Sequence, residues 1–588
     1  MAWLKDNDTI RVAYQSESYG TMSNETYGQV MESGAVFTGS KVHVIDYDRQ
    51  GFADFLKSGD SGADIVEGSG FLFNTVYNVF GEVVDGKNTD KNDLSAKWGN
   101  QTLPDGTLVD FKESMQLTEG DFFFQSFCGA YYEPANKYGE GVGVVDDMWL
   151  NAEEWNIQRM FDVRDENGDY LSSLWDTNMG MGLASLVTDI ENEVAYTVPA
   201  LGQSGYEKIM PINPQHTDYV VMVLAGYNHG VEPAPLKIYV GLKGADVDGT
   251  PIAEDAPERD QFLARNGLLH GKIYGVAASM ETLADLGLED PNPTQELADM
   301  YMANPDAPTE FPVAFVPTSY QWGGWDNPVA VGATEIRRWA MDDEQPEGHM
   351  FFNGNSKTEH PAVDPDITKT RWTQSMSEYG GYLSFDLQKI AAELEAADGA
   401  LPEMLTGLAI RTLPSFDGTL SIEVGDKGIK HGGMGTHATD ENGRAKSNDP
   451  DGLLWVKAAD ADVLLAHEDS GNSFGERSYA LVLNPETLQL VEEGRGYFIA
   501  MAGGDESPRA KAGATALAGA IDKPRTSEFS GSWNLTAMLA RKEDGSFYTM
   551  AEIAGTGENE INASIPVNEH KRGEFSKHFN EQCIVHQQ

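Results

Sequence analysis

A cysteine and two adjacent glutamates bracket a predicted strand in the first third of the chain. Cys128 lies in the aromatic-rich run DFFFQSFCGAYYE, and Glu153 and Glu154 follow the segment VGVVDDMWLN. The pattern predicts a short strand over 142–151 that ends at the carboxylate pair. Acidic groups beside apolar side chains must be protonated, hydrogen-bonded or bound to a cation, because burying an unpaired charge is costly. This stretch is a candidate metal site; the alternative is an exposed strand end in a chain that is acidic throughout.

Two later segments place a carboxylate directly after an apolar run and before a Gly-containing turn. They are HEDSGN (467–472) and TSEFSG (526–531). In a β-propeller, such positions deliver side chains to the central channel. Acidic groups that converge there from several blades would require metal ions to neutralise them.

Three other acidic segments have the composition of calcium-binding loops: DENGD (165–169), ADVDGT (245–250) and DPDGLL (449–454). Calcium requires several oxygens at close range, which closely spaced Asp and Asn around a Gly supply. None of them completes the twelve-residue EF-hand pattern, and 93 acidic residues produce such clusters by chance. The phosphate-binding GxxxxGK[ST] loop, the GxSxG elbow and the CxxC pair are absent from the sequence.

The runs that must position these groups predict a mainly β fold. Short apolar runs bounded by Gly, Asn or Asp recur along the chain and are predicted strands, as in TIRVAYQ, DYVVMVLAG, LKIYVGLKG and SFYTMAEIAG. Helical spacing appears in ERDQFLARNGLLHG and TQELADMYMANP, which lie near Pro-rich junctions. We therefore predict a single β-propeller-like domain over 1–588 with a helical insertion at 245–310; a stacked sandwich is the alternative.

Composition restricts the class of partner. The chain has 588 residues and a formal net charge of −52, so it repels nucleic acid and anionic membranes and gathers cations. A salty or extracellular setting would screen the self-repulsion, although a halophilic cytoplasm would favour the same composition. No run approaches the roughly 18 apolar residues of a membrane helix. The start, MAWLKDNDTIRVAYQ, lacks the features of a signal peptide, which leaves a cytosolic protein or a mature secreted or periplasmic one.

Several motifs, taken in order, resemble the PhoX family of secreted alkaline phosphatases, above all its marine bacterial and cyanobacterial branch. They span roughly residues 60–540 and are FCG (127–129), the strand ending in Glu153–Glu154, VPALG with YEK (198–208), LKIYVGLK (236–243), EIRR (335–338), LLAHEDSGN (464–472) and TSEFSGSWN (526–534). The resemblance implies a propeller with helical insertions that carries a calcium and iron cluster (Ca2+ and Fe3+). It also implies hydrolysis of phosphate monoesters.

The resemblance further implies roles for individual residues. Cys128 would be the thiolate ligand of iron, and the carboxylate ligands would be Glu153, Glu154, Glu207, Glu468 and Asp469. Arg337 or Arg338 would contact the phosphate, because a guanidinium fork suits a tetrahedral oxyanion. The metal ions would neutralise the charge of the transition state and activate an oxygen nucleophile.

The chain departs from the family pattern at two places. The Arg-x-Glu-Asp motif appears as RRWAM (337–341), and Ala225–Gly226 stand where an acidic pair is expected after DYVVMVL. Each carboxylate both coordinates and neutralises a metal ion, so these losses would lower metal affinity.

Two hypotheses follow. The protein is a secreted metal-dependent phosphomonoesterase, or it is a non-catalytic propeller that serves as an extracellular structural protein whose copies associate through bridging calcium.

Overall fold

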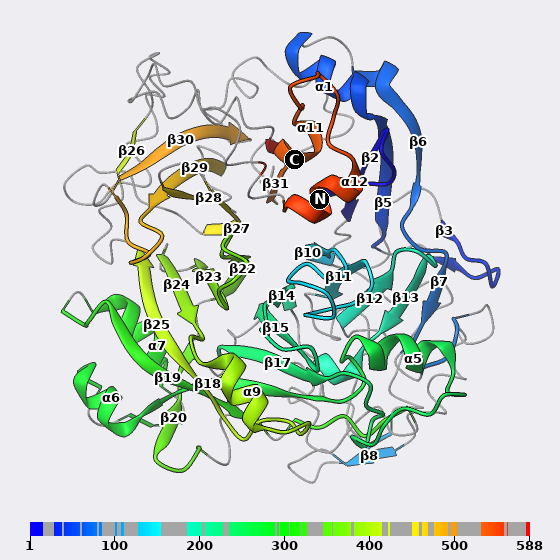
Figure 1. Cartoon of the computed structure of the whole chain (residues 1–588). Coiled ribbons are helices and arrows are strands. Elements are labelled where there is room, and N and C mark those ends of the chain that lie inside the picture. Colours follow the sequence, from blue (N-terminus) through cyan, green and yellow to red (C-terminus); the bar gives the residue numbers. More distant parts are fainter. Residues whose placement is uncertain are drawn as a thin grey trace.

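Strands dominate the computed structural model of the chain, in which four larger sheets surround a common centre (Figure 1). The prediction of a mainly β fold is confirmed. The structure describes residues 1–15, 29–37, 40–58, 62–78, 81–84, 100–102, 108–110, 127–153, 185–202, 206–226, 234–288, 291–292, 295–304, 306–318, 320–325, 345–354, 357–377, 381–413, 421–423, 450–457, 461–468, 476–491, 495–502, 531–557, 561 and 584–587.

The first sheet is formed by the N-terminal part of the chain. Its strands pair in the order β1 (Ala2–Leu4), β2 (Thr9–Gln15), β5 (Val42–Asp48) and β6 (Val66–Phe71). All the pairs are antiparallel. Helix α1 (Arg49–Ser58) and the 3-10 turn η1 (Gly62–Ile65) connect β5 to β6.

The second sheet carries the cysteine. Its strands pair in the order β10 (Phe127–Glu133), β11 (Met148–Glu153), β12 (Ser185–Asp189), β13 (Val194–Thr197) and β7 (Thr75–Tyr77). The strand predicted over 142–151 begins later, at Met148, and ends at Glu153. A turn occupies the preceding residues, where the Asp147 carboxylate accepts a hydrogen bond from the Ala135 amide at 2.7 Å.

The third sheet is the largest and has ten strands. Their order is β14 (Tyr206–Ile212), β15 (Tyr219–Gly226), β17 (Lys237–Leu242), β18 (Gly271–Ser279), β19 (Glu310–Pro317), β25 (Leu405–Leu413), β24 (Gly381–Asp386), β23 (Arg371–Met376) and β22 (Thr358–Val363), and β20 (His349–Phe351) pairs with β18. The end strands β14 and β22 contact each other, so the sheet is curled until it is nearly closed. Many of its side chains belong to the main hydrophobic core.

Helices lie at the outer side of this sheet (Figure 1). The segment 245–310 contains α5 (Glu258–Arg265), α6 (Met280–Asp285) and α7 (Leu297–Ala303), and α9 (Ile390–Ala396) follows later. The same segment also contains β18, which is an interior strand of the sheet. Residues 245–310 therefore contribute both to the sheet and to the helices outside it.

The fourth sheet and the C-terminal strands complete the circle. Four antiparallel strands and a parallel edge strand pair in the order β27 (Pro450–Lys457), β28 (Asp462–Glu468), β29 (Glu476–Leu483), β30 (Arg495–Ala502) and β26 (Ser421–Glu423). Next to β27 lies β31 (Gly531–Asn534), which pairs with β32 (Ile584–Gln587). Short pairs, each bound by hydrogen bonds, are β3 (Gln29–Val30) with β4 (Val36–Phe37), β8 (Asn100–Thr102) with β9 (Leu108–Asp110), and β16 (Ala234–Pro235) with β21 (Asn353–Gly354).

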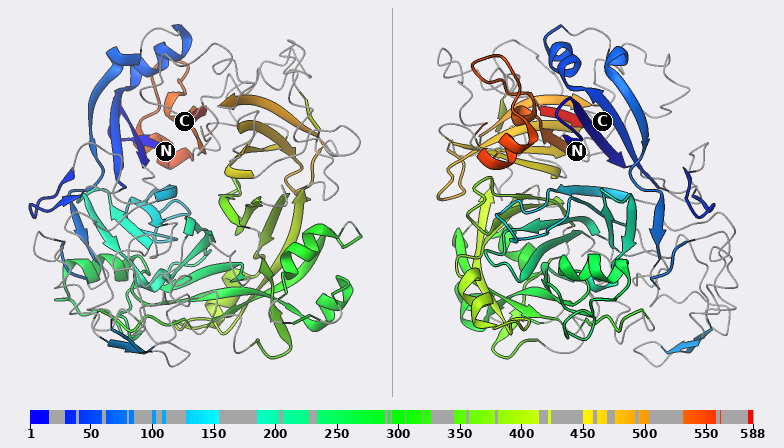
Figure 2. Two further views of the ribbon diagram at one scale, coloured as in Figure 1. Left: turned by 180° about the vertical axis from the view of Figure 1, so that it is seen from behind. Right: turned by 45° about the vertical axis from the view of Figure 1, so that its right-hand side comes forward.

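The two ends of the described chain pack together, as both views in Figure 2 show. Helices α11 (Thr536–Leu539) and α12 (Met550–Thr556) bury side chains against the first sheet. The segment SFYTMAEIAG was predicted as a strand, and this prediction is wrong. Thr549 and Glu552 form a capping box that begins α12, because each side chain bonds the other residue's backbone amide.

Five strands line the centre of the circle. β10, β14, β22, β27 and β31 contact one another in this order, although they come from distant parts of the sequence. These strands position the candidate site. Within the described part of the chain, no helix has the length and apolar character needed to cross a membrane.

Candidate metal centre

Four neighbouring central strands carry a polar residue at the same position. The second residue is Cys128 in β10, Glu207 in β14, Glu359 in β22 and Asp451 in β27. At each of these places the pairing with the next strand is irregular. Such bulges turn a side chain away from the regular alternation of a strand, and they are common beside functional sites.

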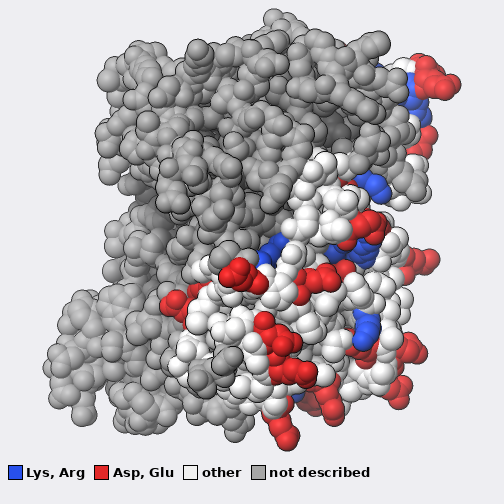
Figure 3. All heavy atoms as spheres, turned by 90° about the vertical axis from the view of Figure 1, so that its left-hand side faces the viewer, with Lys and Arg blue, Asp and Glu red and all other residues white. Residues whose placement is uncertain are grey.

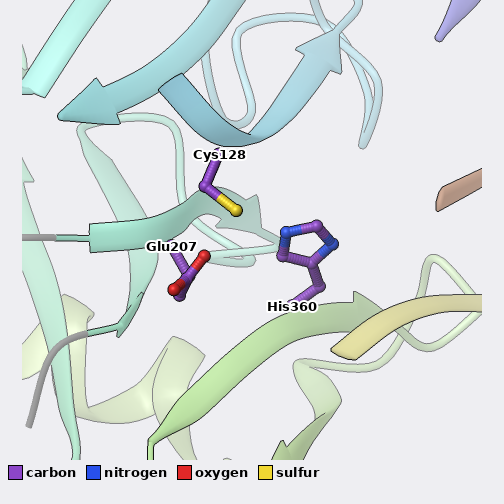
Figure 4. A group of neighbouring side chains, drawn as sticks. All are labelled: Cys128, Glu207 and His360. Carbon is purple, nitrogen blue, oxygen red and sulfur yellow. The ribbon is translucent and has the colours of Figure 1, made fainter. Parts of the chain in front are cut away.

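Three side chains from three of these strands converge (Figure 4). The Sγ of Cys128, a carboxylate oxygen of Glu207 and a ring nitrogen of His360 all lie within 4.8 Å of one another. Glu207 is 0% exposed and His360 is 4% exposed, whereas Cys128 is half-buried. Thiolate, carboxylate and imidazole are the usual protein ligands of a transition metal.

A glycine makes this convergence possible. Gly129 follows Cys128, and a Cβ at this position would lie 2.2 Å from the Glu207 carbonyl oxygen and 2.5 Å from His360 Nε2. Any larger residue would therefore displace the imidazole or separate β10 from β14. The FCG motif thus supplies one ligand, Cys128, and a glycine whose missing side chain leaves room for Glu207 and His360.

Charged groups surround the three ligands. Lys357 forms an ion pair with Glu207 and lies 3.2 Å from a carboxylate oxygen of Glu359. On the other side, His360 Nε2 lies 3.8 Å from Asp451 Oδ1. Lys357 thus offsets part of the buried negative charge, which lowers the cost of burying Glu207.

The surroundings keep His360 neutral. Burial is the largest cause that lowers the pKa of His360 well below its ordinary value, and the charges of Lys208, Lys357 and His467 act in the same direction. Burial likewise lowers the pKa of Lys208 to about 8, although Asp451 opposes the effect. A neutral imidazole has a lone pair available for a metal ion, as coordination requires.

Two carboxylates that the sequence singled out lie at the same end of the sheets. Glu153 is the last residue of β11 and pairs with Phe127, the neighbour of Cys128. Glu468 is the last residue of β28, is 0% exposed and pairs with Pro450, the neighbour of Asp451. The side chain of Glu153 is not among the described parts, and the predicted site residues Glu154, Asp469, Arg337 and Arg338 lie outside the described residues.

Gly226 occupies the corresponding end of β15. It pairs with Tyr206, the neighbour of Glu207, and Ala225 is fully buried beside it. Two small residues therefore stand at this end of β15, which supplies no carboxylate to the site.

The acidic segments that resembled calcium loops differ from one another. DPDGLL is not a loop over its described residues, because Pro450–Leu454 belong to β27 and Asp451 is buried. ADVDGT is a turn in which Asp248 accepts hydrogen bonds from Thr250. DENGD lies outside the described residues.

Sequence reasoning missed His360 and Lys357 as site residues, and it placed Asp451 in a candidate calcium loop, DPDGLL, instead of this site. In KTEHPAV, polar residues come directly before the apolar part of a strand. In LLAHEDSGN, polar residues come directly after one. That pattern was a usable signal for His360. The approach of β22 to β10 and β14, however, has no local signature in the sequence.

The donor set fits some cations better than others. Sulfur and nitrogen ligands suit iron or zinc, with bonds of about 2.0–2.3 Å. Calcium prefers six to eight oxygens, and the three ligands supply only one carboxylate. The Cys128, Glu207 and His360 group therefore fits a transition metal, and calcium would require other carboxylates.

Comparisons with known proteins identify no family. No family model matches the sequence, and no curated protein matches it. Among solved structures, an ancestral GH74 enzyme is similar over 87% of this chain, with 9% sequence identity and a TM-score of 0.21. The match spans about half (52%) of that protein's length.

Proposed function

We propose that the chain is a β-propeller enzyme that uses a transition metal to hydrolyse phosphate monoesters, in the manner that its resemblance to PhoX phosphatases implies. The fold part of this proposal rests on the radial arrangement of sheets around the central strands (Figure 1). In a propeller, each blade is a small antiparallel sheet whose innermost strand faces the central channel. β10, β14, β22, β27 and β31 would be the innermost strands.

The observation that carries the proposal is the convergence of Cys128, Glu207 and His360 within 4.8 Å. Two of them, Cys128 and Glu207, were expected as metal ligands before the fold was considered. Iron is the ion that the resemblance implies, and zinc is the alternative that the same donor set accepts. A bound ion would polarise a phosphoryl oxygen and offset negative charge.

Two lysines favour an anionic substrate. Lys357 lies against Glu207, and the charge of Lys208 acts on His360. The outer surface, by contrast, is rich in acidic side chains on the described part of one face (Figure 3), and the chain has a net charge of −52. A bound metal ion and these two lysines together would offset the carboxylates of the site and attract a phosphate group to this one place. Arg337 or Arg338 remains a proposed additional phosphate contact.

The carboxylates Glu153, Glu154, Glu468 and Asp469 are proposed to hold calcium beside the transition metal. Glu153 and Glu468 end strands at the side of the sheets where Cys128 and Asp451 begin theirs. Calcium would require several of these oxygens together. We further propose that the protein works outside the cytoplasm, in a secreted or periplasmic form, where calcium is abundant and salt screens the acidic surface.

The test is elemental analysis combined with a phosphatase assay on protein purified without chelators. We expect at least one iron or zinc per chain and hydrolysis of a chromogenic phosphate monoester. Cys128→Ser and Glu207→Gln should each lower transition-metal affinity by more than about 100-fold, because the loss of an outer partner alone costs about 10–100-fold. Glu395→Gln, which changes an exposed carboxylate, is the matched control. A metal-free protein that hydrolyses no ester would overturn the proposal.

A second candidate function is a non-catalytic structural role. It is favoured by Ala225 and Gly226, which supply no carboxylate at the end of β15, and by the acidic surface, whose copies calcium would bridge. Light scattering with calcium and then with a chelator distinguishes the two. Reversible, calcium-dependent assembly without esterase activity would favour the structural role, and a calcium-independent monomer would exclude it.

A further inference from the structure

Beyond the three metal-ligand residues, the central strands bring a serine hydroxyl to a histidine. Ser532 Oγ and His467 Nε2 lie 2.8 Å apart, which is hydrogen-bond distance. Ser532 is the second residue of β31, the position that Cys128, Glu207 and Asp451 hold in their own strands. His467 comes from β28 and is 0% exposed, whereas Ser532 is only half-buried.

The register of β27 and β28 connects this pair to the candidate metal centre. Pro450 pairs with Glu468 and Leu453 pairs with Ala466, so Asp451 lies opposite His467 in the bulge between them. Asp451 in turn lies 3.8 Å from His360. Ser532 and His467 therefore extend the row of polar side chains that begins at Cys128 and runs around the centre.

We propose that Ser532 is the nucleophile of this site and that His467 is its general base. A serine hydroxyl becomes nucleophilic when an adjacent imidazole accepts its proton, and this requires the short distance found here. This inference rests on the proposed function and names the residue that attacks the phosphate monoester. Ser532 as a residue is half-buried, whereas His467 is fully buried, which restricts its ring.

The proposed reaction has two steps. Ser532 Oγ forms a bond to phosphorus, its proton passes to His467 Nε2, and the bond between phosphorus and the alcohol oxygen breaks. The departing alcohol takes the proton from His467. Water then attacks the phosphoserine, gives a proton to His467, and releases phosphate as Ser532 regains its proton.

A fluorophosphonate probe tests the nucleophile without depending on metal or on turnover. The serine oxygen would replace fluoride on phosphorus, and mass spectrometry of the digested protein would locate the adduct. We expect stoichiometric labelling of the peptide that contains Ser532, and none in Ser532→Ala. Ser546→Ala is the matched control, because Ser546 is an exposed serine that donates to Asp544; it should be labelled at Ser532 like the wild type.

Activity measurements separate this inference from the proposed function. Ser532→Ala should lower kcat for a phosphate monoester by at least about 100-fold with unchanged metal content and thermal unfolding. His467→Asn should slow labelling by a similar factor if it remains folded. Hydrolysis at the wild-type rate by folded Ser532→Ala would overturn the inference and leave the phosphatase proposal intact. Labelling of Ser532 without any ester hydrolysis would support the nucleophile and count against the phosphatase.

Discussion

Gly129 lies directly against His360, at a distance that leaves no room for a side chain on the glycine. A Cβ on Gly129 would be 2.5 Å from His360 Nε2, which is far inside van der Waals contact. The backbone of β10 therefore packs against the imidazole. This contact links the position of the cysteine strand to the position of the third metal ligand.

The first prediction follows from this contact. Gly129→Ala should lower transition-metal affinity by at least about tenfold and the free energy of unfolding by about 1–3 kcal/mol, because overpacking displaces His360. Metal titration and urea unfolding measure the two effects. Gly68→Ala is the control, since a Cβ there meets no atom within 4 Å. Unchanged metal affinity in Gly129→Ala would show that His360 is not a ligand.

The second prediction concerns the ion pair between Lys357 and Glu207. Lys357→Met leaves a carboxylate that is 0% exposed without its cation, and in the metal-free protein this should cost about 3–5 kcal/mol of stability. Bound metal should restore much of the lost stability, because the positive charge of the ion then compensates the Glu207 carboxylate. The measurement is urea unfolding of both proteins with and without metal.

The control for this prediction is Lys369→Met. Lys369 pairs with Asp366 at 3.6 Å on the surface, and exposed pairs contribute less than about 1 kcal/mol. If the loss in Lys357→Met is the same with and without metal, then Glu207 does not bind the ion.

The third prediction concerns Arg49, which joins the N-terminal sheet to the C-terminal segment that contains Met538 and Tyr548. Its guanidinium is 1% exposed and donates to the carbonyl oxygens of Asn7, Met538 and Tyr548 at 2.7–2.8 Å. Arg49→Lys cannot reach three acceptors with the same geometry, so we expect a loss of about 2–4 kcal/mol. Proteolysis should then cut first near 538–548. The control is Arg265→Lys, at an exposed ion pair, which should lose less than about 1 kcal/mol of stability. Equal losses in both variants would mean that Arg49 does not hold the N-terminal sheet to the C-terminal segment.

The fourth prediction is a pH dependence. Burial raises the pKa of Glu133 from 4.5 to about 7, although the ammonium of Lys137, 3.2 Å away, opposes the shift. Between these pH values the folded protein holds a proton that the unfolded chain has released, so stability falls as the pH rises.

The measurement compares Glu133→Gln, which cannot titrate, with the wild type across this range. The stability of the wild type relative to the variant should decrease by up to about 3 kcal/mol between pH 4.5 and pH 7.5. Glu403→Gln, at an exposed position, is the matched control. A difference that is constant with pH would mean that Glu133 is ionised in the folded protein throughout.

The sequence by itself determined which segments form strands wherever the apolar run was long enough. DYVVMVLAG and LKIYVGLKG became the buried strands β15 and β17, because short apolar runs rich in β-branched and aromatic residues favour buried strands. Cys128 and Glu207 were candidates because their motifs, FCG and YEK, resemble those of the PhoX family. The C-terminal helix α12 was missed because its apolar residues outweighed the capping signal of Thr549 and Glu552.

Tertiary structure decided which polar residues meet. Cys128, Glu207, His360 and Asp451 are spread over more than half of the chain, and each has an ordinary local sequence. They converge because their strands are neighbours at the centre of the circle and because a bulge redirects each strand at the same position. Strand periodicity specifies only which side of a sheet a residue occupies. The neighbours across the centre depend on the closure of the whole ring, which no single segment specifies.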